Sequence, residues 1–169
     1  MHAMVLTLIG KDRAGLVDAI AKCITDADGN WLRSSFCQLS GQFAGFIEVM
    51  LPQENQQLLK DSCAKIAELS ITLSPSDSFD DIKTQTALVK VTANDRKGIV
   101  SDITSALKRF EINIIEMNTT CTSAPNWGNP VFNAEVSVAQ PDSVNLDEVQ
   151  EAIENISDDL MVEIEANYE

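Results

Sequence analysis

The sequence predicts an α+β fold in which one small module occurs twice in tandem. The first observation is a repeated heptapeptide, KDRAGLV at residues 11–17 and NDRKGIV at 94–100, which recurs after 83 positions. That spacing is too long for a solenoid repeat and suits a small domain. The second observation is that the same succession of strand-like and helix-like periods surrounds both heptapeptides. We therefore predict modules at 1–75 and 86–169, joined by a linker at 76–85.

Each module opens with a strand and a helix. The stretches VLTL at 5–8 and LVKV at 88–91 alternate in the manner of half-buried strands. After each turn, apolar residues recur at helical spacing, which predicts one buried stripe on each helix. These two stripes consist of Leu16, Val17, Ile20, Ile24 and Ala27, and of Ile99, Val100, Ile103, Leu107 and Phe110.

Two further strands follow in each module. NWLRSSFCQL at 30–39 and NIIEMNTTCT at 113–122 both open on Asn and are rich in β-forming residues. GFIEVML at 45–51 and FNAEVSV at 132–138 come next. Matching Glu48 to Glu135 gives the second copy four extra residues. They fall in TSAPNWGNP, whose Pro, Asn and Gly favour a turn.

A second amphipathic helix and a short strand close each module. The helices are marked by Leu58, Leu59, Cys63 and Ile66, and by Leu146, Val149, Ile153 and Ile156. The strands alternate through Leu69, Ile71 and Leu73, and through Leu160, Val162 and Ile164. The order βαββαβ therefore occurs twice, which is the ferredoxin-like pattern.

Acidic residues are concentrated in the second half of the chain. The net charge is −14; residues 1–75 carry eight acids and six bases, whereas 76–169 carry eighteen acids and six bases. No Lys or Arg follows Arg109. Nucleic-acid surfaces need clustered Lys or Arg, so we expect no direct binding to nucleic acid. Solubility and docking onto a basic partner both remain open explanations of the acidic half.

We expect neither a catalytic role nor a membrane span for this chain. The one histidine, His2, leaves no basis for a His-based triad or metal site, and neither GxGxxG nor GxxxxGK[ST] occurs. No apolar run reaches the roughly 18 residues that span a bilayer. The four cysteines form no CxxC pair and the N-terminus has no basic leader, so we expect a cytoplasmic chain with reduced thiols. We expect no metal and no cofactor.

The repeated Asp-Arg-x-Gly turn has the residues of a ligand site. Glycine lets the chain turn sharply into the helix, whose first N–H groups are unpaired and attract a carboxylate or phosphate. Arginine adds positive charge, while aspartate either caps the helix or accepts an ammonium group. A cap and bend without any ligand is the structural alternative. The candidate ligand-binding residues are Asp12, Arg13, Ala14, Gly15 and Asn30 in the first module, and Asp95, Arg96, Lys97, Gly98 and Asn113 in the second.

The βαββαβ order, the DRxG turns at 12–15 and 95–98, and the asparagines that head the next strands resemble ACT domains. The resemblance covers nearly the whole chain. It implies regulatory modules that bind amino acids at interfaces between paired copies, so a homodimer is a candidate assembly. The x of DRxG is commonly Pro in that family, whereas this chain has Ala14 and Lys97.

Within that family, the chain is most similar to stand-alone tandem proteins that repress glycine cleavage genes. This resemblance implies a small amino acid as ligand, with glycine the first candidate. It also implies a protein partner, a separate DNA-binding transcriptional activator.

Two other functions remain open from the sequence. One is a free regulatory subunit that docks on a metabolic enzyme. The other is acylphosphatase-like hydrolysis, because that family shares the order of elements and uses an Arg in the first turn with an Asn on the next strand. Arg13 with Asn30, or Arg96 with Asn113, would be the corresponding pairs. The aspartates beside these arginines would repel a phosphate.

Overall fold

The computed structural model describes residues 1–76, 85–123, 128–139 and 143–167. It divides the chain into two compact units, Met1–Asp81 and Ile82–Glu169. Most of the predicted linker at 76–85 and part of the predicted turn at 122–130 lie outside the described residues. None of the helices in the described ranges is long and apolar enough to span a bilayer.

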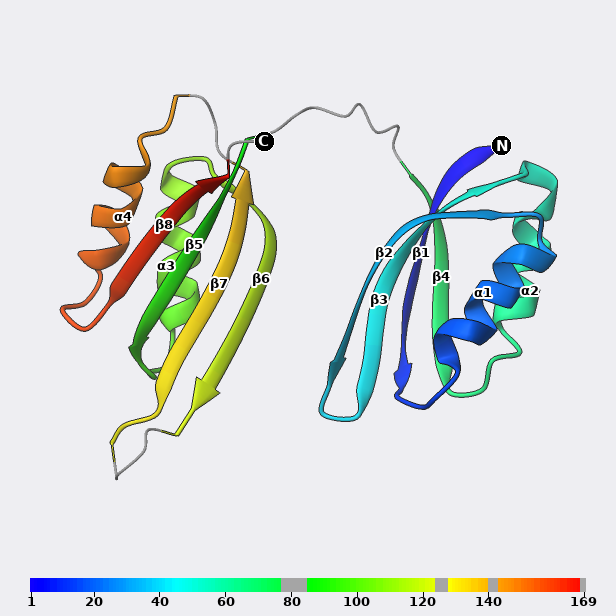
Figure 1. The fold of residues 1–169 in the computed structure, drawn as a ribbon, viewed down its shortest axis with the longest axis horizontal. Coiled ribbons are helices and arrows are strands. Elements are labelled where there is room, and N and C mark those ends of the chain that lie inside the picture. The colour runs from blue at the N-terminus through cyan, green and yellow to red at the C-terminus, as the bar shows by residue number, and fades with distance from the viewer. Residues whose placement is uncertain (77–84, 124–127, 140–142, 168–169) are drawn as a thin grey trace. The chain divides into compact units, whose positions relative to one another are not determined.

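The predicted order of elements is confirmed in both modules (Figure 1). The first module contains β1 (His2–Lys11), α1 (Leu16–Asp26), β2 (Asn30–Leu39), β3 (Gln42–Leu51), a short 3-10 turn (Gln53–Asn55), α2 (Gln56–Cys63) and β4 (Leu69–Pro75). The second contains β5 (Thr86–Asn94), α3 (Ile99–Arg109), β6 (Asn113–Thr122), β7 (Val131–Ala139), α4 (Leu146–Glu154) and β8 (Met161–Asn167).

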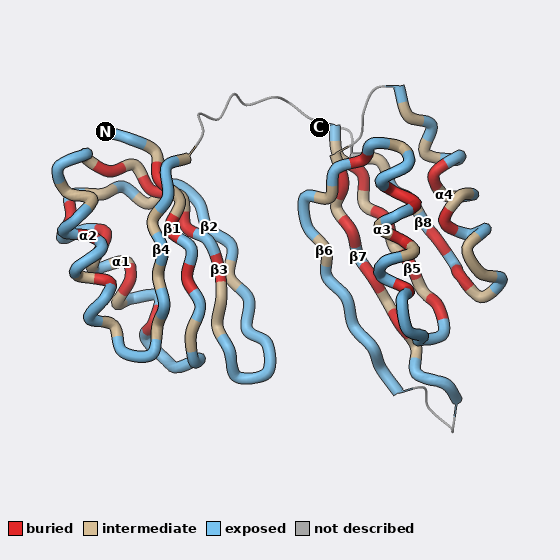
Figure 2. The backbone as a smooth tube through the Cα atoms, turned by 180° about the vertical axis from the view of Figure 1, so that it is seen from behind, coloured by how far each residue is buried: buried red, intermediate tan, exposed pale blue. Residues whose placement is uncertain are grey.

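Each module is one antiparallel sheet with two helices on one of its faces (Figure 1). The strand orders are β2-β3-β1-β4 and β6-β7-β5-β8. The ferredoxin-like fold class is therefore confirmed. Strands β2 and β6 lie at an edge, and both are exposed along most of their length (Figure 2).

Each sheet buries one face against its own helices. Alternate side chains of the central strands are buried, as the period of two in their sequences predicts. The first core is built around Leu6, Leu8, Ile20, Ile47 and Leu59, and the second around Val89, Ile103, Leu107, Val136 and Ile153. The residues of each core come from one module only.

Three residues predicted for the buried stripes are instead exposed. Val17 and Val100 retain 42% and 41% of their exposure, and Leu58 retains 48%. Each stands next to a fully buried stripe residue, and one step along a helix turns the side chain by about 100°. The inward positions are therefore taken by Leu16, Ile99 and Leu59.

The predicted match of Glu48 with Glu135 is wrong. Val5 pairs with Glu48, whereas the equivalent Leu88 pairs with Ser137. Glu135 occupies the position of Phe46, because these two residues pair with Lys90 and Thr7. The second copy thus has six extra residues before this strand rather than four.

Candidate functional site

The repeated turn has almost the same backbone in both modules. Gly15 (φ 84°) and Gly98 (φ 85°) are the N-caps of α1 and α3, and both adopt the left-handed conformation. A side chain at either position would have nothing within 4 Å of its first carbon. These glycines are therefore needed for their φ angle and not for close packing.

Of the two roles left open for Asp12 and Asp95, the structure does not show helix capping, because neither N-cap has a side-chain hydrogen bond. These aspartates directly follow β1 and β5, and their backbone is bonded to the neighbouring hairpins. Their N–H groups donate to the carbonyls of Gly41 (2.9 Å) and Pro130 (2.8 Å) in the neighbouring hairpins. The N-cap glycine lies three residues after each aspartate, and the helix begins at the residue that follows it.

The helix N-termini keep free donors. The first bond within α1 runs from the N–H of Ala19 to the carbonyl of Gly15, 3.0 Å, and in α3 from Asp102 to Gly98, 3.0 Å. The N–H groups before Ala19 therefore have no partner within the helix, and the helix dipole adds partial positive charge there. In α3 the N–H of Ile99 also makes a long bond to the carbonyl of Arg96, 3.5 Å.

In the second module, side chains of other elements hold the turn. Arg96 Nη2 lies 2.7 Å from Asp102 Oδ2. Partial desolvation, and then the nearby Asp95 carboxylate, raise the pKa of the Cys121 thiol. The N–H of Asn94 donates to Asp159 Oδ2, 2.9 Å.

Asp159 also accepts a hydrogen bond from the Ser157 hydroxyl. That bond, and then the bond from Asn94, lower the pKa of Asp159 below its usual value. The carboxylate therefore stays ionised where an ordinary aspartate would begin to protonate, and the end of β5 remains attached. The second turn is thus held by the Arg96–Asp102 ion pair and by the hydrogen bond from Asn94 to Asp159.

In the first module the turn lacks these restraints. Among the described residues, no side-chain hydrogen bond or ion pair is made by Asp12 or Arg13. The equivalent of the Asp159 contact is a long bond from the N–H of Lys11 to the carbonyl of Glu68, 3.4 Å. Both charged side chains are exposed and free to meet a ligand.

The asparagines do not lie beside the turns of their own modules. Asn30 pairs with Met50 at one end of the sheet, whereas Lys11, just before the turn, pairs with Gln42 at the other. Eight residues separate Gln42 from Met50, which is about 26 Å along a strand. Asn113 is separated from the second turn in the same way, since it pairs with Ala139 and Asn94 with Val131.

This separation bears on two sequence-based hypotheses. A ligand that contacts both the turn and an asparagine needs that asparagine from outside the module. The acylphosphatase-like pairs, Arg13 with Asn30 and Arg96 with Asn113, are not brought together within a module. Among the described residues there is also no group of three His, Cys, Asp or Glu side chains that could hold a metal ion.

Comparison with protein families gives the same division of the chain. Residues 2–74 and residues 82–163 each match a model of the ACT domain. The chain belongs to the ACT domain family. It is an ACT-domain regulatory protein, with both modules of the ACT type and in tandem.

Two crystal structures share the tandem ACT fold over nearly the whole chain. One is an unknown protein from Galdieria sulphuraria, 23% identical, with a TM-score of 0.87 and coverage of 99% of both chains. The other is provisionally assigned as a glycine cleavage system transcriptional repressor; it is 17% identical, with a TM-score of 0.70 and coverage of 98% of both chains. At these identities the likeness shows the fold alone. No curated protein matches this sequence.

Sequence reasoning missed the residues that restrain the second ACT turn. Cys121 and Asp159 reach it from β6 and from the segment before β8, and no local pattern connects them to residues 94–98. The ion pair of Asp102 with Arg96 could have been predicted from the sequence, because Asp102 lies in the first turn of α3, close to Arg96. The corresponding position in the first ACT module is Ala19, which removes the ion pair there.

Proposed function

We propose that this protein senses a small amino acid, with glycine the first candidate, through the turn of the first ACT module. The observation that carries the proposal is the free pair of Asp12 and Arg13 at the open N-terminus of α1. The helix N–H groups and Arg13 suit the carboxylate of a zwitterion. The carboxylate of Asp12 suits its ammonium group.

The difference in ligand affinity between the two turns can be estimated. A ligand at the second turn would compete with the Arg96–Asp102 ion pair, which is partly exposed. Exposed pairs of this kind contribute roughly 0.2–1 kcal/mol, so the competition lowers affinity by up to about fivefold.

Glycine binding is the direct test. Titration calorimetry of the whole chain with glycine, serine and alanine should give a weak dissociation constant for the best ligand, since every turn residue is exposed. We expect about 1 mM, which corresponds to about 4 kcal/mol. Larger amino acids such as leucine are the matched controls. Absence of heat and of any stability change with all small amino acids would show that the turns only start helices.

We further propose that the protein acts on transcription by contacting a DNA-binding activator, as a repressor of glycine cleavage genes. The tandem ACT fold and the acidic second half support this reading. Affinity capture from lysate, with and without glycine, tests it. Capture of a DNA-binding activator supports the proposal, whereas capture of a metabolic enzyme supports the alternative of a docking regulatory subunit.

The purified protein should not bind DNA. The net charge of −14 and the absence of any base after Arg109 leave few groups to displace counterions from phosphates. A gel shift at low salt is a severe check, because low salt strengthens non-specific binding. A retarded band for the pure protein would contradict the expectation, and a band only with an added activator would agree with it.

A further inference from the structure

The helix layer of the first module contains two cysteines on neighbouring helices. Cys23 lies in the third turn of α1 and is half-buried, whereas Cys63 is the last residue of α2 and keeps only 1% of its exposure. Both side chains pack in the same hydrophobic core. Two thiols in one core have a chemistry that a single buried thiol lacks, because they can join in a disulfide.

The packing of the helices brings these two thiols together. α1 contacts α2, and the side-chain amide of Asn55 at the start of α2 donates to the carbonyl of Ala27 at the end of α1, 3.0 Å. Cys23 precedes Ala27 by four residues, so it lies one turn away on the same side of α1. Burial, and then the neighbouring Cys23 thiol, raise the pKa of Cys63 to about 12. The two sulfurs therefore interact across the helix pair.

The second module holds the same positions without sulfur. The repeat places Ala106 at the position of Cys23. Ile153 corresponds to Cys63, because each is the second of two buried residues spaced four apart on its helix. Both replacements are buried. Since hydrocarbon side chains fill these positions in one module, packing alone does not require two thiols in the other.

We propose that Cys23 and Cys63 form a reversible disulfide between α1 and α2 when the protein meets hydrogen peroxide. Peroxide reaches Cys23 first, because Cys63 is buried and its raised pKa keeps the thiol protonated. The Cys23 thiolate attacks one peroxide oxygen, the O–O bond breaks and hydroxide leaves. The product at Cys23 is a sulfenic acid.

The second step closes the disulfide. The Cys63 sulfur attacks the Cys23 sulfur, the S–O bond of the sulfenic acid breaks, and the proton of Cys63 leaves with the oxygen as water. In sum, two thiols and one peroxide give one disulfide and two waters, and the two electrons pass from sulfur to the peroxide. A dithiol such as dithiothreitol reverses the change and is itself oxidised to a cyclic disulfide.

A hollow beside Cys63 supplies a route for the water and the proton. It has a volume of about 240 Å³, and Lys60 is among its lining residues. A single water needs roughly 15 Å³ of such space, so water can reach the buried sulfur. On the side of the sheet the hollow is lined by Leu6, Leu69, Ile71 and Leu73.

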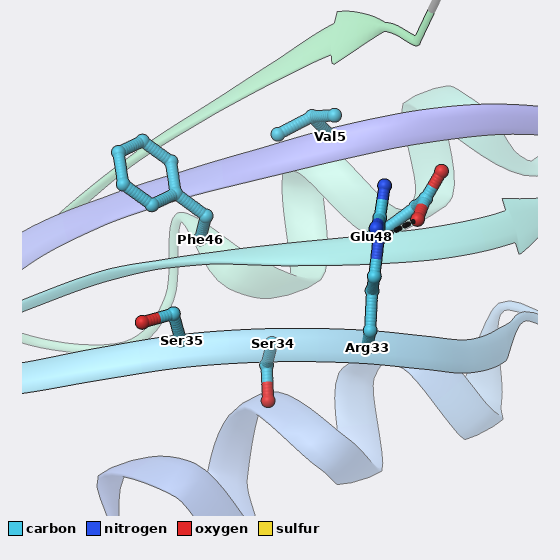
Figure 3. A pocket seen from close by; sticks show the side chains of 6 residues that line it. All are labelled: Val5, Arg33, Ser34, Ser35, Phe46 and Glu48. Atoms are coloured by element: carbon cyan, nitrogen blue, oxygen red, sulfur yellow. Dashed lines mark hydrogen bonds and ion pairs between the residues drawn. The ribbon is translucent and has the colours of Figure 1, made fainter. Parts of the chain in front are cut away.

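The exposed cysteine of the first module lies on the other side of the sheet. Arg33 and Ser35 line a hollow on the face that the helices leave uncovered (Figure 3). Side chains alternate between the faces along a strand, so Cys37, two residues after Ser35, projects from that same face. The sheet therefore separates Cys37 from Cys23 and Cys63.

Brief peroxide treatment of the dilute whole chain, followed by blocking of free thiols and tryptic mass spectrometry, tests the proposal. Trypsin cleaves after Lys and Arg, which leaves each cysteine on its own peptide, 23–33, 34–60, 61–65 or 110–169. Peptides 23–33 and 61–65 should appear joined as the main product, and dithiothreitol should separate them. In urea, Cys23 should instead join mainly to Cys37, because the shorter loop closes more readily.

Two variants and a melting curve complete the test. Cys23→Ala, which copies Ala106, should abolish the link, whereas Cys37→Ser is the matched control and should leave its yield within about twofold of wild type. Oxidation should raise the melting temperature of wild type by about 5 °C or more, since the link restricts the unfolded chain, and should not raise that of Cys23→Ala.

Three results would overturn the proposal. The first is a native wild-type chain in which Cys23 joins Cys37 or Cys121, or stays unlinked. The second is a Cys23→Ala chain that gains the same stability on oxidation. The third is a linked wild-type chain that melts no higher than the reduced one, because the disulfide would then not fit the native packing of α1 on α2.

Discussion

Gly15→Val is expected to abolish glycine binding, whereas Gly98→Val should leave it nearly unchanged. Both glycines have φ near 85°, a conformation that a β-branched residue avoids. Valine at position 15 therefore forces the turn into another backbone conformation, which reorients the N–H groups at the start of α1. Glycine titration of both variants by calorimetry is the measurement, with at least a tenfold loss expected for Gly15→Val.

The two variants form a matched pair. Each introduces the same backbone strain, about 1–3 kcal/mol, at a site where the new side chain meets no neighbour. Both should therefore lose similar stability, and the difference in binding reports the ligand site alone. Arg13→Ala should weaken binding by about fivefold, since an exposed charged contact contributes up to about 1 kcal/mol. A loss confined to Gly98→Val would place the site in the second module.

Gly45→Ala is expected to destabilise the first module by about 1–3 kcal/mol, in the range of overpacked cores. An alanine methyl group there would overlap the carbonyl oxygen of Ser35 and the ring of Phe36 across the strand pair. The Phe36 ring cannot move freely, because it stacks on Phe43 with ring centres 5.2 Å apart. Urea unfolding followed by Trp31 fluorescence, in a Trp127→Phe background, measures the loss.

The second module supplies the control for this prediction. The pair equivalent to Gly45 and Phe36 is Ala134 and Thr119. There, alanine takes the place of glycine and the smaller threonine takes the place of phenylalanine. Phe36→Thr should therefore offset part of the damage, with a coupling free energy of at least about 0.5 kcal/mol in a double-mutant cycle. The reverse change, Ala134→Gly, should cost no more than about 1 kcal/mol. Additive effects of Gly45→Ala and Phe36→Thr would contradict the steric account.

Much of the fold follows from local patterns. Apolar periods of two and of about 3.6 predict the helices and the strands that bury one side against a core. The edge strands β2 and β6 are largely exposed, and only their β-forming residues predict them. The repeat fixed where α1 and α3 begin. The alignment of β3 with β7 does not follow from the sequence pattern. Matching Glu48 to Glu135 relies on residue type alone, whereas the hydrogen-bond register depends on the length of the preceding hairpin loop.

The candidate site was predictable only in part. The left-handed conformation of Gly15 and Gly98 follows from the sharp turn that leads into each helix. The repeated Asp-Arg-x-Gly sequence indicates where that turn lies. The sequence places Asn30 and Asn113 at the start of the next strand, and an eleven-residue helix carries the chain about 16 Å from the turn before that strand begins. The contacts of Asp95 and Asn94 with Cys121 and Asp159 join segments far apart in sequence, so no local pattern announces them.

The replacement of Phe46 by Glu at the equivalent position of the second module has an evolutionary consequence. In a dimer of single-module chains, every substitution appears on both subunits, so a mutation that suits one surface is imposed on the other. Fusion of the two copies into one polypeptide removes that constraint. Each module then accumulates substitutions independently, and one module can gain a new function while the other keeps the original one.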